Sequence, residues 1–221
     1  MAMGDAGEGL MFGELVAFLD VLKSTVADLR GRKASKEREE TIATLLRTYF
    51  LLKDAAEEGA ALVEDAKPNP VQVIQSLEPA LAEERLAKWN RSLRRQTARL
   101  MGVSSMVYSQ EFMDVVSPDL RERLYDVLGS KVDRATSLHG IGAALFFRGI
   151  VIDSPEEQAR YVSIMAGEEG DLLHMDKIQR EVDALQQALE SYRQAVTTLA
   201  TPDEIIRLTR DARAKTTFPA A

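Results

Sequence analysis

The chain has 221 residues, enough to bury one sizeable hydrophobic core or two small ones. Its formal net charge of -7 gives no overall attraction to nucleic acid or to anionic membranes, and a sequence without cysteine excludes disulfides, thiolate zinc sites and cysteine nucleophiles. Only 6% of the residues are aromatic, and aliphatic residues with alanine supply most of the apolar content, which favours helix packing over a β-sheet.

Two amphipathic helices are predicted near the start of the chain. Residues 12–30 and 37–66 carry apolar residues at intervals of three and four, which places them along one stripe of each helix. Gly31 suits the end of the first helix, and Ser35 suits the start of the second. A connection this short predicts an antiparallel hairpin. The small, polar residues 1–9 are predicted to be a flexible lead-in.

A break at Lys67–Pro70 separates this hairpin from the next helices, because proline restricts both itself and the residue before it. A short helix is predicted at 71–78 and a long one at 81–113. The apolar stripe of the long helix contains one polar residue, Gln96, which can set the register of helix packing. Gly102 lies inside the same helix and is expected to bend or weaken it.

Weaker signals follow between 114 and 174. A serine followed by proline and an acidic residue predicts helices over 118–128 and 154–166. The run 141–147 is apolar on all sides and is predicted to be a buried core segment. Residues 149–153 are interpreted as an extended connector, because a single strand cannot form a sheet. Between the helix at 118–128 and the apolar run at 141–147, the chain is expected to continue as a helix, with apolar residues at helical spacing at Val132, Ala135 and Leu138.

The most regular apolar pattern lies at 175–199 and predicts a helix about 37 Å long that must bury one stripe. Ala188 and Ala195 flank the stripe, and small flanking residues favour burial among several helices over an isolated two-stranded zipper. Thr201 begins one more short helix, in which Ile205, Ile206 and Leu208 are expected to be buried. The stripe of the long helix consists of Met175, Ile178, Val182, Leu185, Leu189, Tyr192, Val196 and Leu199.

Together these patterns predict an all-α fold. We expect an antiparallel bundle of about four long amphipathic helices with coiled-coil-like seams, and several shorter helices packed on it. Residues 10–215 are expected to form a single helical domain, with 114–117 as the alternative boundary that would subdivide it. Residues 216–221 are expected to be a frayed tail. The long helices are 12–30, 37–66, 81–113 and 175–199.

Candidate catalytic and metal sites are few, because the sequence contains only two histidines. Asp171 and His174 are three residues apart, a spacing used by di-metal carboxylate bundles, but those need a second such motif and two more inward carboxylates. His139 has no matching acidic residue. We therefore predict no catalytic residue, no metal and no cofactor, and a metal-dependent enzyme is the least favoured hypothesis.

The most distinctive local chemistry is a basic stretch in an otherwise acidic chain. Arginine side chains grip phosphates and carboxylates with two hydrogen bonds, so this stretch is a candidate binding site for nucleic acid, an anionic ligand or an acidic partner. The favoured alternative is intramolecular pairing with the glutamate-rich helix at 37–66, and Trp89 is expected to lie in the core. The candidate residues are Arg85, Lys88, Arg91, Arg94, Arg95 and Arg99.

The leading functional hypothesis is a non-catalytic interaction or scaffold protein that acts through helix–helix contacts with itself or with a protein partner. Nucleic-acid or anionic-ligand binding through residues 85–99 is the second hypothesis and is not favoured. No run of apolar residues is long enough to span a bilayer, so we expect no membrane span and a cytoplasmic location.

Overall fold

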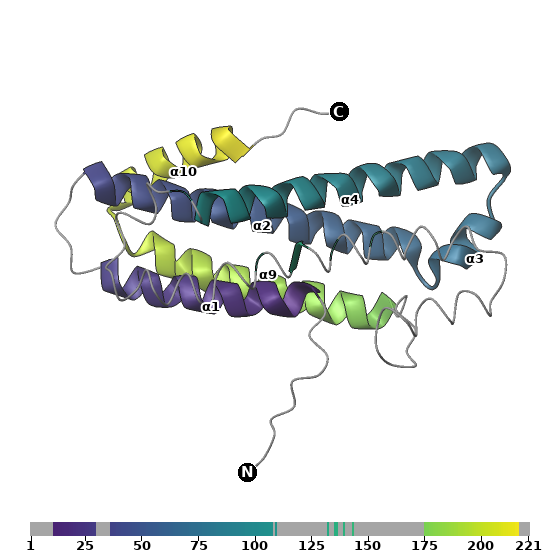
Figure 1. Ribbon diagram of the computed structural model, residues 1–221, viewed down its shortest axis with the longest axis horizontal. Coiled ribbons are helices and arrows are strands. Elements are labelled where there is room, and N and C mark those ends of the chain that lie inside the picture. Colours follow the sequence, from purple (N-terminus) through teal and green to yellow (C-terminus); the bar gives the residue numbers. More distant parts are fainter. Residues whose placement is uncertain are drawn as a thin grey trace, which may run out of the picture.

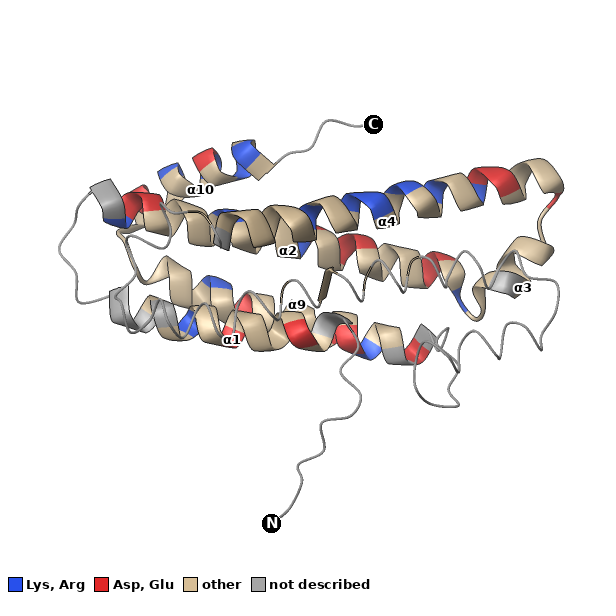
Figure 2. Cartoon of the chain, in the orientation of Figure 1, with Lys and Arg blue, Asp and Glu red and all other residues tan. Residues whose placement is uncertain are grey.

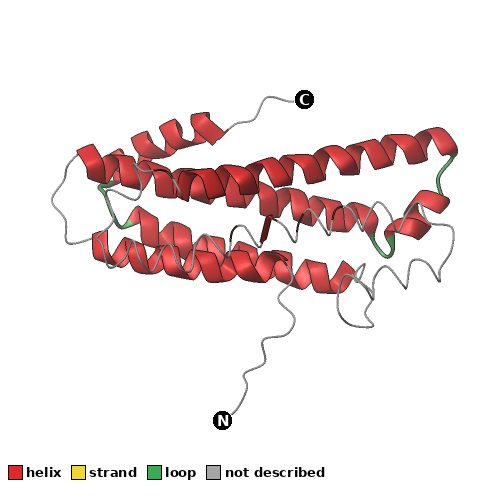
Figure 3. Cartoon of the chain, viewed as in Figure 1, coloured by secondary structure: helices red, strands yellow, loops and turns green. Residues whose placement is uncertain are grey.

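The computed structural model describes residues 11–29, 36–107 and 175–216, together with six single residues. These described residues contain six helices and no β-strand, which confirms the all-α class for this part of the chain (Figure 3). None of the described helices is both long and apolar enough to cross a membrane. The helices are α1 (Met11–Leu29), α2 (Lys36–Ala66), α3 (Pro70–Gln75), α4 (Pro79–Val107), α9 (Met175–Thr197) and α10 (Pro202–Thr216). The single residues are Ser109, Val132, Ala135, Thr136, His139 and Ala143.

Several predicted features lie outside the described residues. They are the lead-in at 1–9, the helices at 118–128 and 154–166, the connector at 149–153, Leu138, and the run 141–147 apart from Ala143. Thr216, the first residue of the predicted tail, is instead the last residue of α10 and is buried, while the rest of that tail is also outside the described range.

The longest helix, α2, lies at the centre of the described structure and packs against α4, α9 and α10 (Figure 1). Contacts near its two ends show that it runs antiparallel to α9, because Leu45 meets Tyr192 while Lys67 meets Gln179. By contrast, the neighbouring helices α1 and α9 run in the same direction (Figure 1). The antiparallel arrangement expected for the whole bundle therefore stays a prediction.

The close approach of α2 and α4 depends on a small residue. A Cβ atom added to Gly102 would lie 3.3 Å from Leu51 Cδ1, tighter than ordinary van der Waals contact. The helix nevertheless continues without interruption through this glycine to Val107. Gly102 thus lets α4 pack closely on α2 and does not end the helix.

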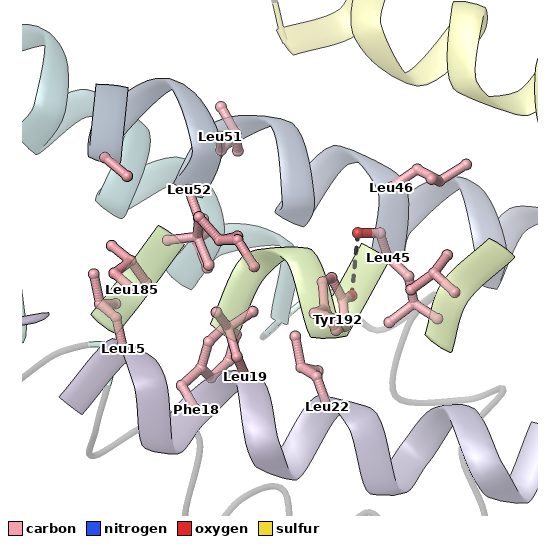
Figure 4. Close-up of a cluster of buried hydrophobic side chains, with 14 of the residues drawn as sticks. Leu15, Phe18, Leu19, Leu22, Leu45, Leu46, Leu51, Leu52, Leu185 and Tyr192 are labelled. Carbon is pink, nitrogen blue, oxygen red and sulfur yellow. Dashed lines mark hydrogen bonds between the residues drawn. The ribbon is translucent and has the colours of Figure 1, made fainter. Parts of the chain in front are cut away.

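The stripe of α9 forms the middle of the main hydrophobic core, as its spacing predicted. Its residues from Val182 to Leu199 are buried, and Ile178 is half-buried. The hydroxyl of Tyr192 donates a hydrogen bond of 3.1 Å to the carbonyl oxygen of Leu45, so its one polar atom is satisfied inside the core (Figure 4). Leucines from α1, α2 and α9 surround this tyrosine. Burial of these apolar side chains supplies most of the driving force for folding of the bundle.

A second, smaller core lies where α2 and α4 meet α3. It is built around Trp89, which is 1% exposed and packs with Leu93, Val63 and Ala66. The expectation that Trp89 is a core residue is confirmed.

Isolated described residues between 132 and 143 contribute to both cores, and His139 among them contacts Gln96 and Thr97 of α4. Val132, Ala135, Thr136, His139 and Ala143 are all helical and are spaced as residues on one helix face. Val132 and Ala135 are helical, as expected from the sequence, and are buried in the main core, while Ala143 packs against the core around Trp89.

Candidate functional site

The predicted basic stretch lies on α4, and part of it faces the acidic side of α2 (Figure 2). At one end, Lys88 pairs with Asp65, and Arg85 lies 4.0 Å from the same carboxylate. Nearer the middle, Arg95 donates a hydrogen bond of 2.7 Å to Glu58. As the residue numbers increase along α4, those of the contacted residues on α2 decrease, so these two helices are antiparallel.

Arg99 is the most deeply placed cation of the stretch. It is 9% exposed, and its guanidinium lies 2.5 Å from Glu58 and 3.9 Å from Asp54. Moving an unpaired charged side chain out of water costs several kcal/mol. A charge as buried as that of Arg99 therefore requires partners of opposite charge. Both carboxylates are themselves largely shielded, so the group acts as an internal clamp between α2 and α4.

Arg91 and Arg94 complete the predicted stretch and behave differently. Both are exposed, and neither forms an ion pair with any residue that the structure describes. Helix geometry explains Arg94, which is turned well away from Arg99, whereas Arg91 lies one helical turn from Lys88 and Arg95, at the exposed edge of the paired side. Four of the six candidate cations therefore face carboxylates of α2, and two are left for an external anion.

Asp54 also joins α10 to the bundle. Arg213 donates two hydrogen bonds to its carboxylate, at 2.8 and 2.7 Å, and the guanidinium of Arg213 stacks 5.2 Å from the centre of the Phe50 ring. Near the start of α10, Arg207 pairs with Glu39 of α2. Because both pairs follow the same order along the two helices, α10 runs parallel to α2.

The start of α10 follows the capping pattern of its sequence. Glu204 accepts a hydrogen bond of 2.9 Å from the backbone nitrogen of Thr201, and the Thr201 hydroxyl accepts one of 3.4 Å from the backbone nitrogen of Glu204. The pKa of Glu204 is lowered because its carboxylate accepts hydrogen bonds from both the backbone nitrogen and the hydroxyl of Thr201. The cap thus marks where α10 begins, while the pairs Arg207–Glu39 and Arg213–Asp54 hold the helix on α2.

An open, mainly apolar groove runs between α10 and α2. Its volume is about 530 Å³, and it is a shallow depression that is open to solvent. Ile206 borders the groove and is 58% exposed, which makes it one of the few large apolar side chains left in water among the described residues. The groove is lined by Phe50, Ile205, Ile206, Thr209, Arg210, Arg213 and Ala214.

The expectation that Ile206 is buried is therefore wrong. Leu208 is buried and Ile205 is half-buried, but residues two apart on a helix point to nearly opposite sides. Once Leu208 faces α2, Ile206 must face outward. The sequence contained this signal, since Leu208 and Ala212 already define one face of α10.

His139 lies in a separate buried site against α4. Its Nδ1 is 3.0 Å from the hydroxyl of Thr97, and its Nε2 is 3.1 Å from Oε1 of Gln96. Nε2–H donates to Oε1 of Gln96, because an amide oxygen can only accept, while the Thr97 hydroxyl donates a hydrogen bond of 3.0 Å to the carbonyl oxygen of Leu93. Burial lowers the pKa of His139 to about 4. The single polar position predicted in the α4 stripe thus pairs with a buried histidine.

Neither histidine provides a described metal site. Asp171 and His174 lie outside the described residues, and the part of the chain that is described contains no group of three or more His, Asp or Glu residues placed to hold a metal ion. Comparison of the chain with known protein families, with curated proteins and with solved structures gave no match.

Proposed function

We propose that this chain is a non-catalytic interaction protein that acts through helix–helix contacts with a protein partner or with a second copy of itself. The observation that carries the proposal is the apolar groove between α2 and α10, with Ile206 exposed at its border. An apolar groove between helices is a common docking site for the apolar face of an amphipathic helix. The proposal includes a cytoplasmic location and, as the scaffold, a helical bundle built around the antiparallel packing of α2 with α4 and α9.

The second hypothesis, anion or nucleic-acid binding through α4, has less support. Cations that already contact Asp65 or Glu58 would have to exchange those carboxylates for phosphates, with little net gain. Arg91 and Arg94 alone would neutralise about two phosphates, whereas specific and tight nucleic-acid binding uses about six or more. The groove is therefore the better candidate for recognition.

A test of this proposal compares complexes formed by the wild-type chain with those of two variants. Ile206→Glu places a charge at the border of the groove, and Leu81→Glu is the matched control because Leu81 is a similarly exposed apolar residue on α4. Native purification with cross-linking and light scattering is expected to show a complex for the wild type and for Leu81→Glu, and its loss in Ile206→Glu. A strict monomer without a bound protein, or a complex unchanged by Ile206→Glu, would contradict the proposal.

A further inference from the structure

We propose that the groove between α2 and α10 is a self-association site, in which α10 packs antiparallel against α10 of a second copy across a two-fold axis. This inference rests on the proposed function and names the occupant of the groove. It is carried by the distribution of apolar and charged side chains on the outer face of α10.

The outer face of α10 carries a stripe at helical spacing. Leu208, Ala212 and Thr216 are buried, so this side of the helix faces the bundle. The opposite side carries side chains separated by three, four and four residues, which places them in one row. Each member of this row is exposed to solvent. They are Asp203, Ile206, Arg210 and Ala214.

The charges of this row are self-complementary. In an antiparallel pair with the axis beside Ile206, Asp203 lies opposite the partner's Arg210, and Arg210 lies opposite the partner's Asp203. A two-fold interface repeats every contact, so one ion pair implies a second on the other side of the axis. Neither Asp203 nor Arg210 forms an ion pair with another described residue, so both are available.

The apolar part of the face is also self-complementary. Ile206 projects from α10 directly beside the groove, whose lining includes Phe50 and Ile205. Across the two-fold axis, Ile206 of each copy can enter the groove of the other, as a knob enters a hole between helices. The neighbouring cation Arg213 does not repel a second copy strongly, because two hydrogen bonds to Asp54 neutralise it.

This combination favours a second copy over an unrelated partner. An unrelated helix would need an acidic residue and an apolar residue at a matching distance, and α10 itself presents both. The helix has 15 residues and is about 22 Å long, so the face is smaller than that of a permanent dimer. We therefore expect a reversible dimer whose population rises with protein concentration.

Sedimentation equilibrium of the full chain tests this arrangement with two charge-reversal variants. In a dimer of Asp203→Arg, the new arginine of each copy would lie opposite the partner's Arg210, so cations would repel at both positions. In a dimer of Arg210→Asp, the new aspartate of each copy would lie opposite the partner's Asp203, so acids would repel at both positions. Each variant alone is expected to weaken the dimer about tenfold or more. An equimolar mixture of the two variants is expected to recover dimers, because every pair across the mixed interface then has opposite charges. Far-ultraviolet circular dichroism verifies that each variant keeps the helical fold.

Ile206→Glu is expected to be monomeric, and Leu81→Glu is expected to dimerise like the wild type. The inference is overturned if the wild type is monomeric up to about 100 μM, a range in which a weak dimer would be populated. It is also overturned if either charge reversal dimerises normally, or if the mixture gains nothing. If the wild type is monomeric but binds another protein through Ile206, only the self-association is refuted. If it is monomeric and binds no protein, the proposed function is refuted as well.

Discussion

Acidification is predicted to destabilise the fold through His139. This side chain is 3% exposed and lies between Gln96 and Thr97, both uncharged. Burial lowers its pKa from 6.5 to about 4. In the unfolded chain the imidazole is protonated below pH 6.5, whereas in the folded protein it stays neutral until about pH 4. The unfolded state therefore binds more protons in this window, and stability falls as the pH is lowered through it.

The magnitude follows from the two pKa values. Each pH unit between them changes the free energy of unfolding by about 1.4 kcal/mol. The gap between 6.5 and about 4 therefore corresponds to a loss of about 3 kcal/mol once pH 4 is reached, and to no loss above pH 6.5. A loss of this size is a large fraction of the stability of an ordinary domain, about 5–15 kcal/mol.

Urea denaturation at a series of pH values measures this effect, with the fluorescence of Trp89 as the probe, since it is the only tryptophan and is buried. Carboxylates also titrate in acid, so the matched control is His139→Gln, which has no titrating group but can still donate and accept hydrogen bonds. Between pH 7 and pH 4, the wild type is expected to lose about 3 kcal/mol more than the variant. Equal losses in the two proteins would refute the reasoning.

Three further contacts are tested by substitution, with urea denaturation or hydrogen exchange as the measurement. Tyr192→Phe removes the hydroxyl that donates to Leu45 and is expected to cost about 1 kcal/mol of unfolding free energy; no change would contradict the buried hydrogen bond. Arg99→Ala is expected to cost about 2 kcal/mol and Arg91→Ala less than about 0.5 kcal/mol, because only Arg99 is buried between carboxylates; equal costs would contradict the clamp. Thr201→Ala removes the cap of α10 and is expected to cost about 1 kcal/mol and to speed amide exchange in α10, whereas unchanged exchange there would show that the cap is dispensable.

The positions of the helices were largely predictable because burial imposes the helical period on the sequence. The predicted helices at 12–30, 37–66 and 175–199 correspond closely to α1, α2 and α9. The signal of threonine followed by proline at 201 also located the start of α10, whereas α4 begins at Pro79, two residues before the predicted start at 81. The directions of neighbouring helices were less predictable, because apolar stripes do not specify which stripe packs against which. The parallel pair α1 and α9 illustrates this.

The candidate site was predictable in part. A helical projection of α4 separates Arg94 from Arg99 but places Arg91 one turn from Lys88 and Arg95, so the sequence contained only part of the division of the basic stretch. The same projection of α10 would have placed Ile206 on the outer face. The groove itself could not be predicted, because it requires Phe50 to meet residues of α10 that lie more than 150 positions away in the chain. The Asp54–Arg213 pair joins the same two helices and is likewise not indicated by any local sequence pattern.

Disulfide trapping at position 206 tests the proposed interface most directly. The sequence has no cysteine, so Ile206→Cys gives each chain one thiol, and Leu81→Cys gives a control thiol at a similarly exposed site on α4. A two-fold axis beside position 206 brings the two thiols near the separation that a disulfide requires, with Cβ atoms about 4 Å apart. We predict that mild oxidation links Ile206→Cys into covalent dimers at least about tenfold faster than Leu81→Cys, because association raises the effective thiol concentration. Equal rates of dimer formation in the two variants would contradict the account.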